Sequence, residues 1–70
     1  MKISARNVLA GTVKRVEPGA INDEVVIALE HGIEIVAIIT HASAQRLGLA
    51  PGKPAHAVIK ASDVMVAVDP

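Results

Sequence analysis

Residues 25–49, which read VVIALEHGIEIVAIITHASAQRLGL, contain the patterns of three of the expected elements, two strands and a helix. Residues 25–29 and 33–40 are rich in Val and Ile and flank the dipeptide His31-Gly32. β-branched side chains favour strands, and a tight turn between two such runs favours a hairpin. The stretch therefore predicts two antiparallel strands joined at His31-Gly32.

The second half of the same stretch predicts a short helix. Thr40 can accept a hydrogen bond as its N-cap, and Arg46 falls in its last turn. Gly48 suits the left-handed position that ends a helix, with Leu49 as the hydrophobic residue that follows it. Pro51 then prevents the helix from continuing.

Strand patterns lie on both sides of this stretch. Residues 3–16 predict a long first strand, with Gly11 as a bend or bulge. Residues 55–60 and 64–68 predict two short strands near the end of the chain. Five strands with one short helix between the third and fourth is the element order of a small Greek-key barrel of the OB type. The sequence thus predicts an all-β fold: a small five-stranded Greek-key OB-like barrel.

The composition predicts one domain that assembles with copies of itself. The 70 residues suffice for a single domain, residues 1–70, and 51% of them are hydrophobic. The chain has no Phe, Tyr or Trp, the side chains that bury the most area each. Since one small barrel cannot hide so much aliphatic surface, we expect a homo-oligomer that buries it between subunits.

Several classes of site are disfavoured by the residues present. Absence of cysteine excludes disulfides and thiolate metal sites. His31, His41 and His56 lack metal-ligand spacing, so we expect turn and surface roles, with a pH-sensitive interface as the alternative. Asp23 and Glu24 are expected to be solvated charges at a strand end. No nucleophile–base set or phosphate loop is present, and we expect no catalysis.

The charge pattern bears on location and on macromolecular partners. The longest stretch without a charged residue, residues 35–45, is shorter than the ~20 residues of a membrane span. No apolar segment of a signal peptide follows the first charges, so we expect a cytoplasmic protein without a membrane association. Zero net charge and zero aromatic residues argue against nucleic acid as a partner.

Three pairs of side chains could hold a small anion. Each pair joins a hydroxyl to a cation or to a second hydroxyl: Ser4 with Arg6, Lys60 with Ser62, and Thr40 with Ser43. Ser4 and Arg6 are expected on one strand face, and Asp63 is expected to point away from the face of Lys60 and Ser62. A tetrahedral dianion needs N–H and O–H donors with a few cations and no carboxylates. A solvated strand face or a plain helix cap remains the alternative.

Three segments, in this order along the chain, resemble the molbindin family, whose units are also called Mop domains. They are ISARNVLAGTV (residues 3–13), RLGL with Pro51-Gly52 (residues 46–52), and VIKASDVM (residues 58–65). The resemblance covers nearly the whole chain. It implies an OB-like barrel that assembles as a hexamer, a trimer of dimers, and binds molybdate or tungstate at subunit interfaces.

The resemblance also implies which residues hold the anion. The expected site consists of Ser4, Ala5 and Arg6 with Lys60, Ala61 and Ser62, completed by Thr40 and Ser43. Arg6 and Lys60 would supply charge, while Ala61 would offer only a backbone N–H. No cofactor is expected, and no metal atom is directly coordinated by the protein.

The resemblance implies reversible binding of molybdate for intracellular molybdenum storage or homeostasis. The alternative is a stand-alone oligomerisation or sensor module that acts through a partner protein. Nothing in the sequence resembles a helix-turn-helix or a P-loop ATPase, so such a module would depend on that partner.

Overall fold

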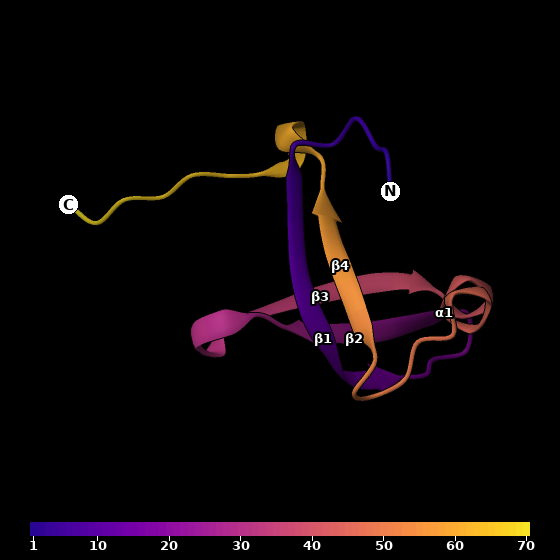
Figure 1. The fold of residues 1–70 in the computed structure, drawn as a ribbon. Helices are drawn as coiled ribbons and strands as arrows, with labels where there is room; N and C mark the ends of the chain where they lie inside the picture. Colours follow the sequence, from indigo (N-terminus) through magenta and orange to yellow (C-terminus); the bar gives the residue numbers. More distant parts are fainter.

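A computed structural model describes all of residues 1–70, and its body consists of four strands and one α-helix (Figure 1). The elements, in chain order, are β1 (Asn7–Glu17), β2 (Asn22–Ala28), the 3-10 helix η1 (Glu30–Gly32), β3 (Glu34–Thr40), α1 (His41–Leu47), β4 (Pro54–Ile59) and the 3-10 helix η2 (Ala61–Asp63). None of the helices has the length and apolar character that a membrane span requires.

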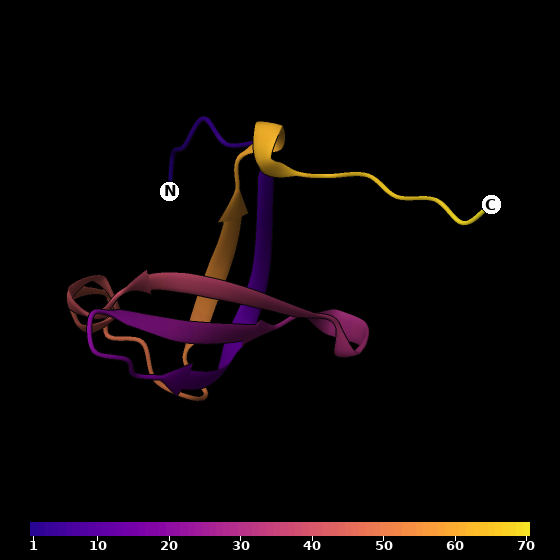
Figure 2. The same ribbon diagram turned by 180° about the vertical axis from the view of Figure 1, so that it is seen from behind.

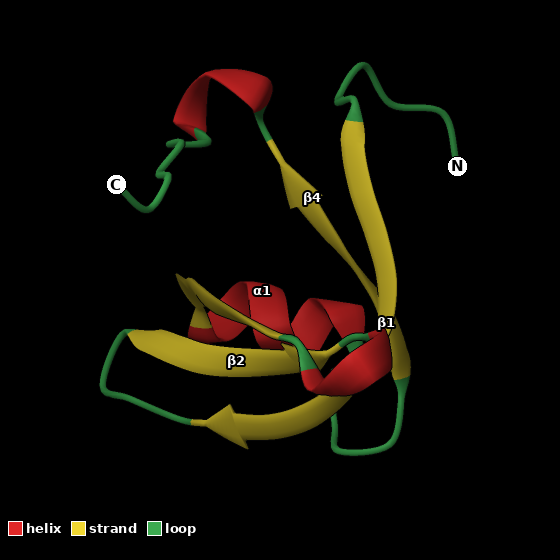
Figure 3. Cartoon of the chain, turned by 90° about the vertical axis from the view of Figure 1, so that its left-hand side faces the viewer, coloured by secondary structure: helices red, strands yellow, loops and turns green.

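One antiparallel sheet with the strand order β3-β2-β1-β4 contains all four strands. The long strand β1 pairs with β4 through its first half and with β2 through its second half, and Thr12 takes part in both pairings. The register of the second pairing shifts between Val13 and Arg15, as at a β-bulge. The sheet is therefore strongly curled, with the β1–β4 arm rising from the β2–β3 arm (Figures 1 and 3).

The first strand differs from the prediction at two points. It begins at Asn7 rather than at residue 3, because β4, its partner at that end, finishes at Ile59 opposite Asn7. The irregular register lies after Val13, not at Gly11. A Cβ on Gly11 would lie 2.5 Å from the backbone oxygen of Ala28, so glycine here permits a close approach of two strands.

The hairpin and the helix agree with the prediction. β2 and β3 pair antiparallel, and the connection at His31-Gly32 has positive φ at both residues. Thr40 Oγ1 accepts a hydrogen bond of 3.1 Å from the Ser43 N–H. Gly48 adopts φ +66°, and the N–H groups of Gly48 and its successor donate back to the last helical turn, which forms a Schellman cap.

The core is small for so hydrophobic a chain. Only seven of the 70 residues are buried. The central cluster consists of Val13, Val25, Ile27 and Ala57, which face one another from β1, β2 and β4. Many larger aliphatic side chains stay exposed in the single chain, as the composition predicted.

The expected fifth strand does not form, so the domain is a four-stranded sheet and not a closed five-stranded barrel. Residues 64–70 have no regular structure and extend away from the body in both views (Figures 1 and 2). Val66 and Val68 are 89% and 88% exposed. A strand needs a neighbouring edge for its N–H and C=O groups, and η2 directs this segment away from both edges of its own sheet.

A cationic hollow at the strand ends

The antiparallel pairing of β1 and β4 creates a hollow at one end of the molecule. Asn7, the first residue of β1, lies opposite Ile59, the last residue of β4. The segment that precedes β1 therefore meets the segment that follows β4, although they are far apart in the sequence.

This hollow has a volume of about 450 Å³, and four of its seven lining residues are polar or charged. Its lining residues are Ile3, Ser4, Ala5, Arg6, Lys60, Ala61 and Ser62. Arg6 and Lys60 are its only charged residues, and no carboxylate lines it. The structure thus brings together six of the eight residues that the sequence analysis selected.

The geometry that unites them is not the predicted one. Ser4 and Arg6 precede the strand and do not share a strand face, and Ser62 lies within η2. They converge because of the β1–β4 register. Asp63 is not part of the lining, as predicted, but the reason is not strand alternation. It lies in the 3-10 helix η2, where its N–H donates to the Lys60 oxygen at 2.9 Å.

Thr40 and Ser43 do not join the hollow of their own chain. They lie at the start of α1, at the other end of the molecule from η2 (Figures 1 and 3). The Thr40 hydroxyl donates to Ser43 Oγ at 2.8 Å, in addition to accepting the capping bond. Within one chain these two hydroxyls form a helix cap.

A buried polar contact that the sequence did not predict lies near this cap. Asp23 is only 2% exposed, contrary to the expectation of a solvated charge. Both of its carboxylate oxygens lie 3.0 Å from Nδ1 of His41, and one accepts a bond of 3.3 Å from the Gly19 N–H. No sequence pattern indicated this pair, because its partners meet only when β2, β3 and α1 are folded together.

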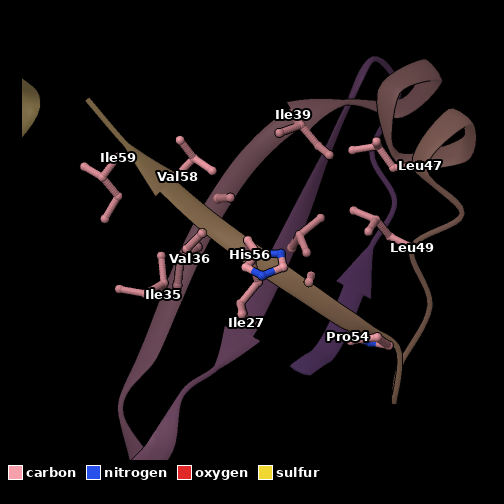
Figure 4. A pocket seen from close by; sticks show the side chains of 14 residues that line it. Ile27, Ile35, Val36, Ile39, Leu47, Leu49, Pro54, His56, Val58 and Ile59 are labelled. Atoms are coloured by element: carbon pink, nitrogen blue, oxygen red, sulfur yellow. The ribbon is translucent and has the colours of Figure 1, made fainter. Parts of the chain in front are cut away.

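A second, apolar groove of about 470 Å³ lies between β3 and β4 (Figure 4). Twelve of its 14 lining residues are hydrophobic. The lining residues come from four elements: Val25 and Ile27 of β2, Ile35, Val36, Ala37 and Ile39 of β3, Leu47 and Leu49 at and after the end of α1, and all of β4. His56 is the one titratable residue among them. β3 and β4 are also the two edge strands of the sheet, so the groove separates two unpaired edges.

The curled sheet, the single capped helix and the hollow lined by two cations define a small, mostly-β domain. The TOBE domain family matches residues 3–66, and the chain belongs to this family, among its molbindin (Mop) members.

Known proteins similar to the chain support this assignment. It is 52% identical over 67 residues to the molybdenum-pterin-binding protein MopA of Rhodobacter capsulatus, covering 96% of this chain and 25% of MopA. The solved structure of a molybdate-binding protein from Sporomusa ovata superposes with a TM-score of 0.91 at 40% identity, covering 97% of this chain and all of that one.

The molybdate-bound structure of the cytoplasmic molybdate-binding protein ModG gives a TM-score of 0.89 at 52% identity. That match covers 93% of this chain and 46% of ModG. The chain also spans about a quarter of the length of MopA and of similar curated relatives. The domain described here therefore recurs both alone and within longer proteins.

Proposed function

We propose that the hollow binds molybdate reversibly, and that the protein is a binding protein rather than an enzyme. The observation that carries this proposal is the convergence of Arg6, Lys60, Ser4 and Ser62 around a space without carboxylates. The similarity to two molybdate-binding proteins, the Sporomusa ovata protein and ModG, and to the molybdenum-pterin-binding protein MopA supports the choice of anion.

The residues of the hollow suit a tetrahedral dianion. The Arg6 guanidinium can donate two parallel hydrogen bonds to neighbouring oxygens, whereas the Lys60 ammonium acts as a point charge. Hydroxyls of Ser4 and Ser62 add neutral donors, and Ala5 and Ala61 add backbone N–H groups. Tungstate has the same charge and nearly the same shape, so we expect it to bind about as well.

Thr40 and Ser43 complete the shell from a second copy of the chain. Their position far from the hollow of their own chain supports an interface site, since the hollow is open and its own chain supplies donors only from residues 3–6 and 60–62. Anion binding and assembly are then linked, so molybdate stabilises the oligomer and the oligomer completes the site.

The apolar groove and the free C-terminal segment support the oligomer itself. Residues 64–68 are apolar and extended, and the groove is apolar and bordered by two unpaired strand edges. A fifth strand placed between β3 and β4 would pair with both edges and close the barrel. We propose that residues 64–68 of one copy fill the groove of another, within the hexamer that the family resemblance implies.

The biological role that fits these properties is intracellular molybdenum storage or homeostasis in the cytoplasm. ModG is described as a cytoplasmic molybdate-binding protein, which supports this location. The second candidate function is an oligomerisation or sensor module that acts through a partner. It is favoured by the groove, which would assemble copies whether or not an anion is bound.

Isothermal titration with molybdate, tungstate and sulfate, combined with native mass spectrometry, tests the proposal. We expect saturable binding of molybdate and tungstate with similar affinity, and weaker binding of the smaller sulfate. An oligomer that binds none of the three would favour the module that acts through a partner. If sulfate binds as tightly as molybdate, the hollow is not selective for the larger anion, which would contradict this expectation.

A further inference from the structure

We infer that Asn7 is the positioning residue of the anion site, because its amide fixes the two halves of the hollow against each other. This inference rests on the proposed function and deepens it. Asn7 does not line the hollow, and no donor to the anion is assigned to it.

The contact that carries the inference joins the two strand ends. Asn7 Nδ2 donates a hydrogen bond of 3.2 Å to the backbone oxygen of Ile59, across 52 residues of sequence. A carbonyl oxygen can only accept, so the amide nitrogen and not its oxygen faces Ile59. No other side-chain hydrogen bond connects β1 with β4.

The hydrogen bond between Asn7 and Ile59 lies next to both cations of the hollow. Asn7 directly follows Arg6, and Ile59 directly precedes Lys60, so the bond lies one residue from each of the two cations. The ends of a strand ladder open more easily than its middle, and both cations lie beyond the last paired residues. The side-chain amide thus holds the ladder closed at the point where both cationic segments leave it.

Planarity of the peptide bond extends this effect to Lys60. The Ile59 oxygen and the Lys60 nitrogen belong to one rigid plane, so a bond that orients the oxygen also orients the start of the turn that follows. Lys60 is the N-cap residue of η2 and has no side-chain cap bond of its own. Asn7 therefore supplies the side-chain hydrogen bond that sets the direction in which η2 leaves the sheet.

The test compares Asn7→Ala with the matched variant Asn22→Ala. Asn22 begins β2 as Asn7 begins β1, but it is exposed and forms no side-chain hydrogen bond. Titration with molybdate and sulfate is measured for both variants, with native mass spectrometry of each to check that the subunit number is unchanged. Asn7→Thr serves as a second variant, because Thr favours strands and its hydroxyl is too short to reach Ile59.

We expect Asn7→Ala and Asn7→Thr to weaken molybdate binding about threefold to tenfold, the range for one lost hydrogen bond. A hollow held less firmly should also discriminate less between the two anions. The ratio of the dissociation constant for sulfate to that for molybdate should therefore fall toward one. A loss of fold stability alone would leave this ratio at its original value. Asn22→Ala should change neither quantity.

Two results separate failure of this inference from failure of the proposed function. If Arg6→Ala weakens binding while both Asn7 variants keep the affinity and the discrimination of the unchanged protein, the inference is overturned and the proposed function stands. If the unchanged protein binds neither molybdate nor tungstate, the proposed function and the inference that rests on it are both overturned.

Discussion

The carboxylate of Asp23 is held by Nδ1 of His41, with both oxygens 3.0 Å from that nitrogen. The pair joins the start of β2 to the start of α1, and a hydrogen bond of 2.8 Å from the His41 N–H to the Ile21 oxygen reinforces it. The cap formed by Thr40 and Ser43 is thereby anchored to the sheet. This contact makes Asp23 a structural residue, although its charge predicted a solvated position.

Asp23→Ala should destabilise the fold by about 1–3 kcal/mol, because the Gly19 N–H and the His41 ring lose their charged acceptor. Asp23→Asn should cost less, since one amide oxygen can still accept. The measurement is thermal or urea unfolding followed by circular dichroism. Asp69→Ala, a change of an exposed acid near the C-terminus, is the matched control and should leave the unfolding midpoint in place. Equal midpoints for Asp23→Ala and Asp69→Ala would show that the pair contributes nothing.

Arg6→Ala should reduce the affinity for molybdate by about tenfold to a hundredfold, as expected for one charge-assisted hydrogen bond. Arg6 is exposed and outside the core, so the unfolding midpoint without anion should stay the same. Isothermal titration measures the loss, and Arg15→Ala, an exposed arginine on β1 remote from the hollow, controls for net charge. An equal loss in both variants would mean that only the overall charge matters.

Thr40→Ala should weaken molybdate binding and also lower the stability by about 1 kcal/mol, because the same hydroxyl caps α1. Thr40→Ser keeps the hydroxyl and should preserve both properties. If Thr40 serves the hollow of another copy, mixing Arg6→Ala chains with Thr40→Ala chains should restore some intact sites. Titration of refolded mixtures against the two separate variants measures this recovery. Mixtures that bind no better than the average of the two variants would argue against a shared site.

Val66→Asp should reduce assembly, because it places a charge on the segment proposed to fill the apolar groove of a second copy. Native mass spectrometry should show smaller species than for the unchanged chain, and molybdate affinity should fall with them. Lys53→Asp, in the exposed turn before β4, introduces the same side chain outside the groove and should assemble normally. An intact oligomer of the Val66 variant would contradict the assigned role of residues 64–68.

The sequence predicted those parts of the fold that depend on neighbouring residues. Thr40 and Gly48 determine where the helix begins and ends through hydrogen bonds within a few residues, and the structure confirms both. The β2–β3 hairpin is confirmed for the same reason. The fifth strand was predicted from its own apolar residues, but a strand also needs an edge, and the single chain offers residues 64–68 none.

The inventory of the candidate site follows from the sequence alone: two cations, several hydroxyls and one adjacent carboxylate, that of Asp63. Which of these residues meet depends on the folded chain. Ser4 and Arg6 join Lys60 and Ser62 because β1 and β4 pair with Asn7 opposite Ile59, and Thr40 remains apart because α1 lies at the other end. The physical reason is that local hydrogen bonds and propensities act along the chain. The register between strands 52 residues apart depends on packing and pairing across the whole sheet.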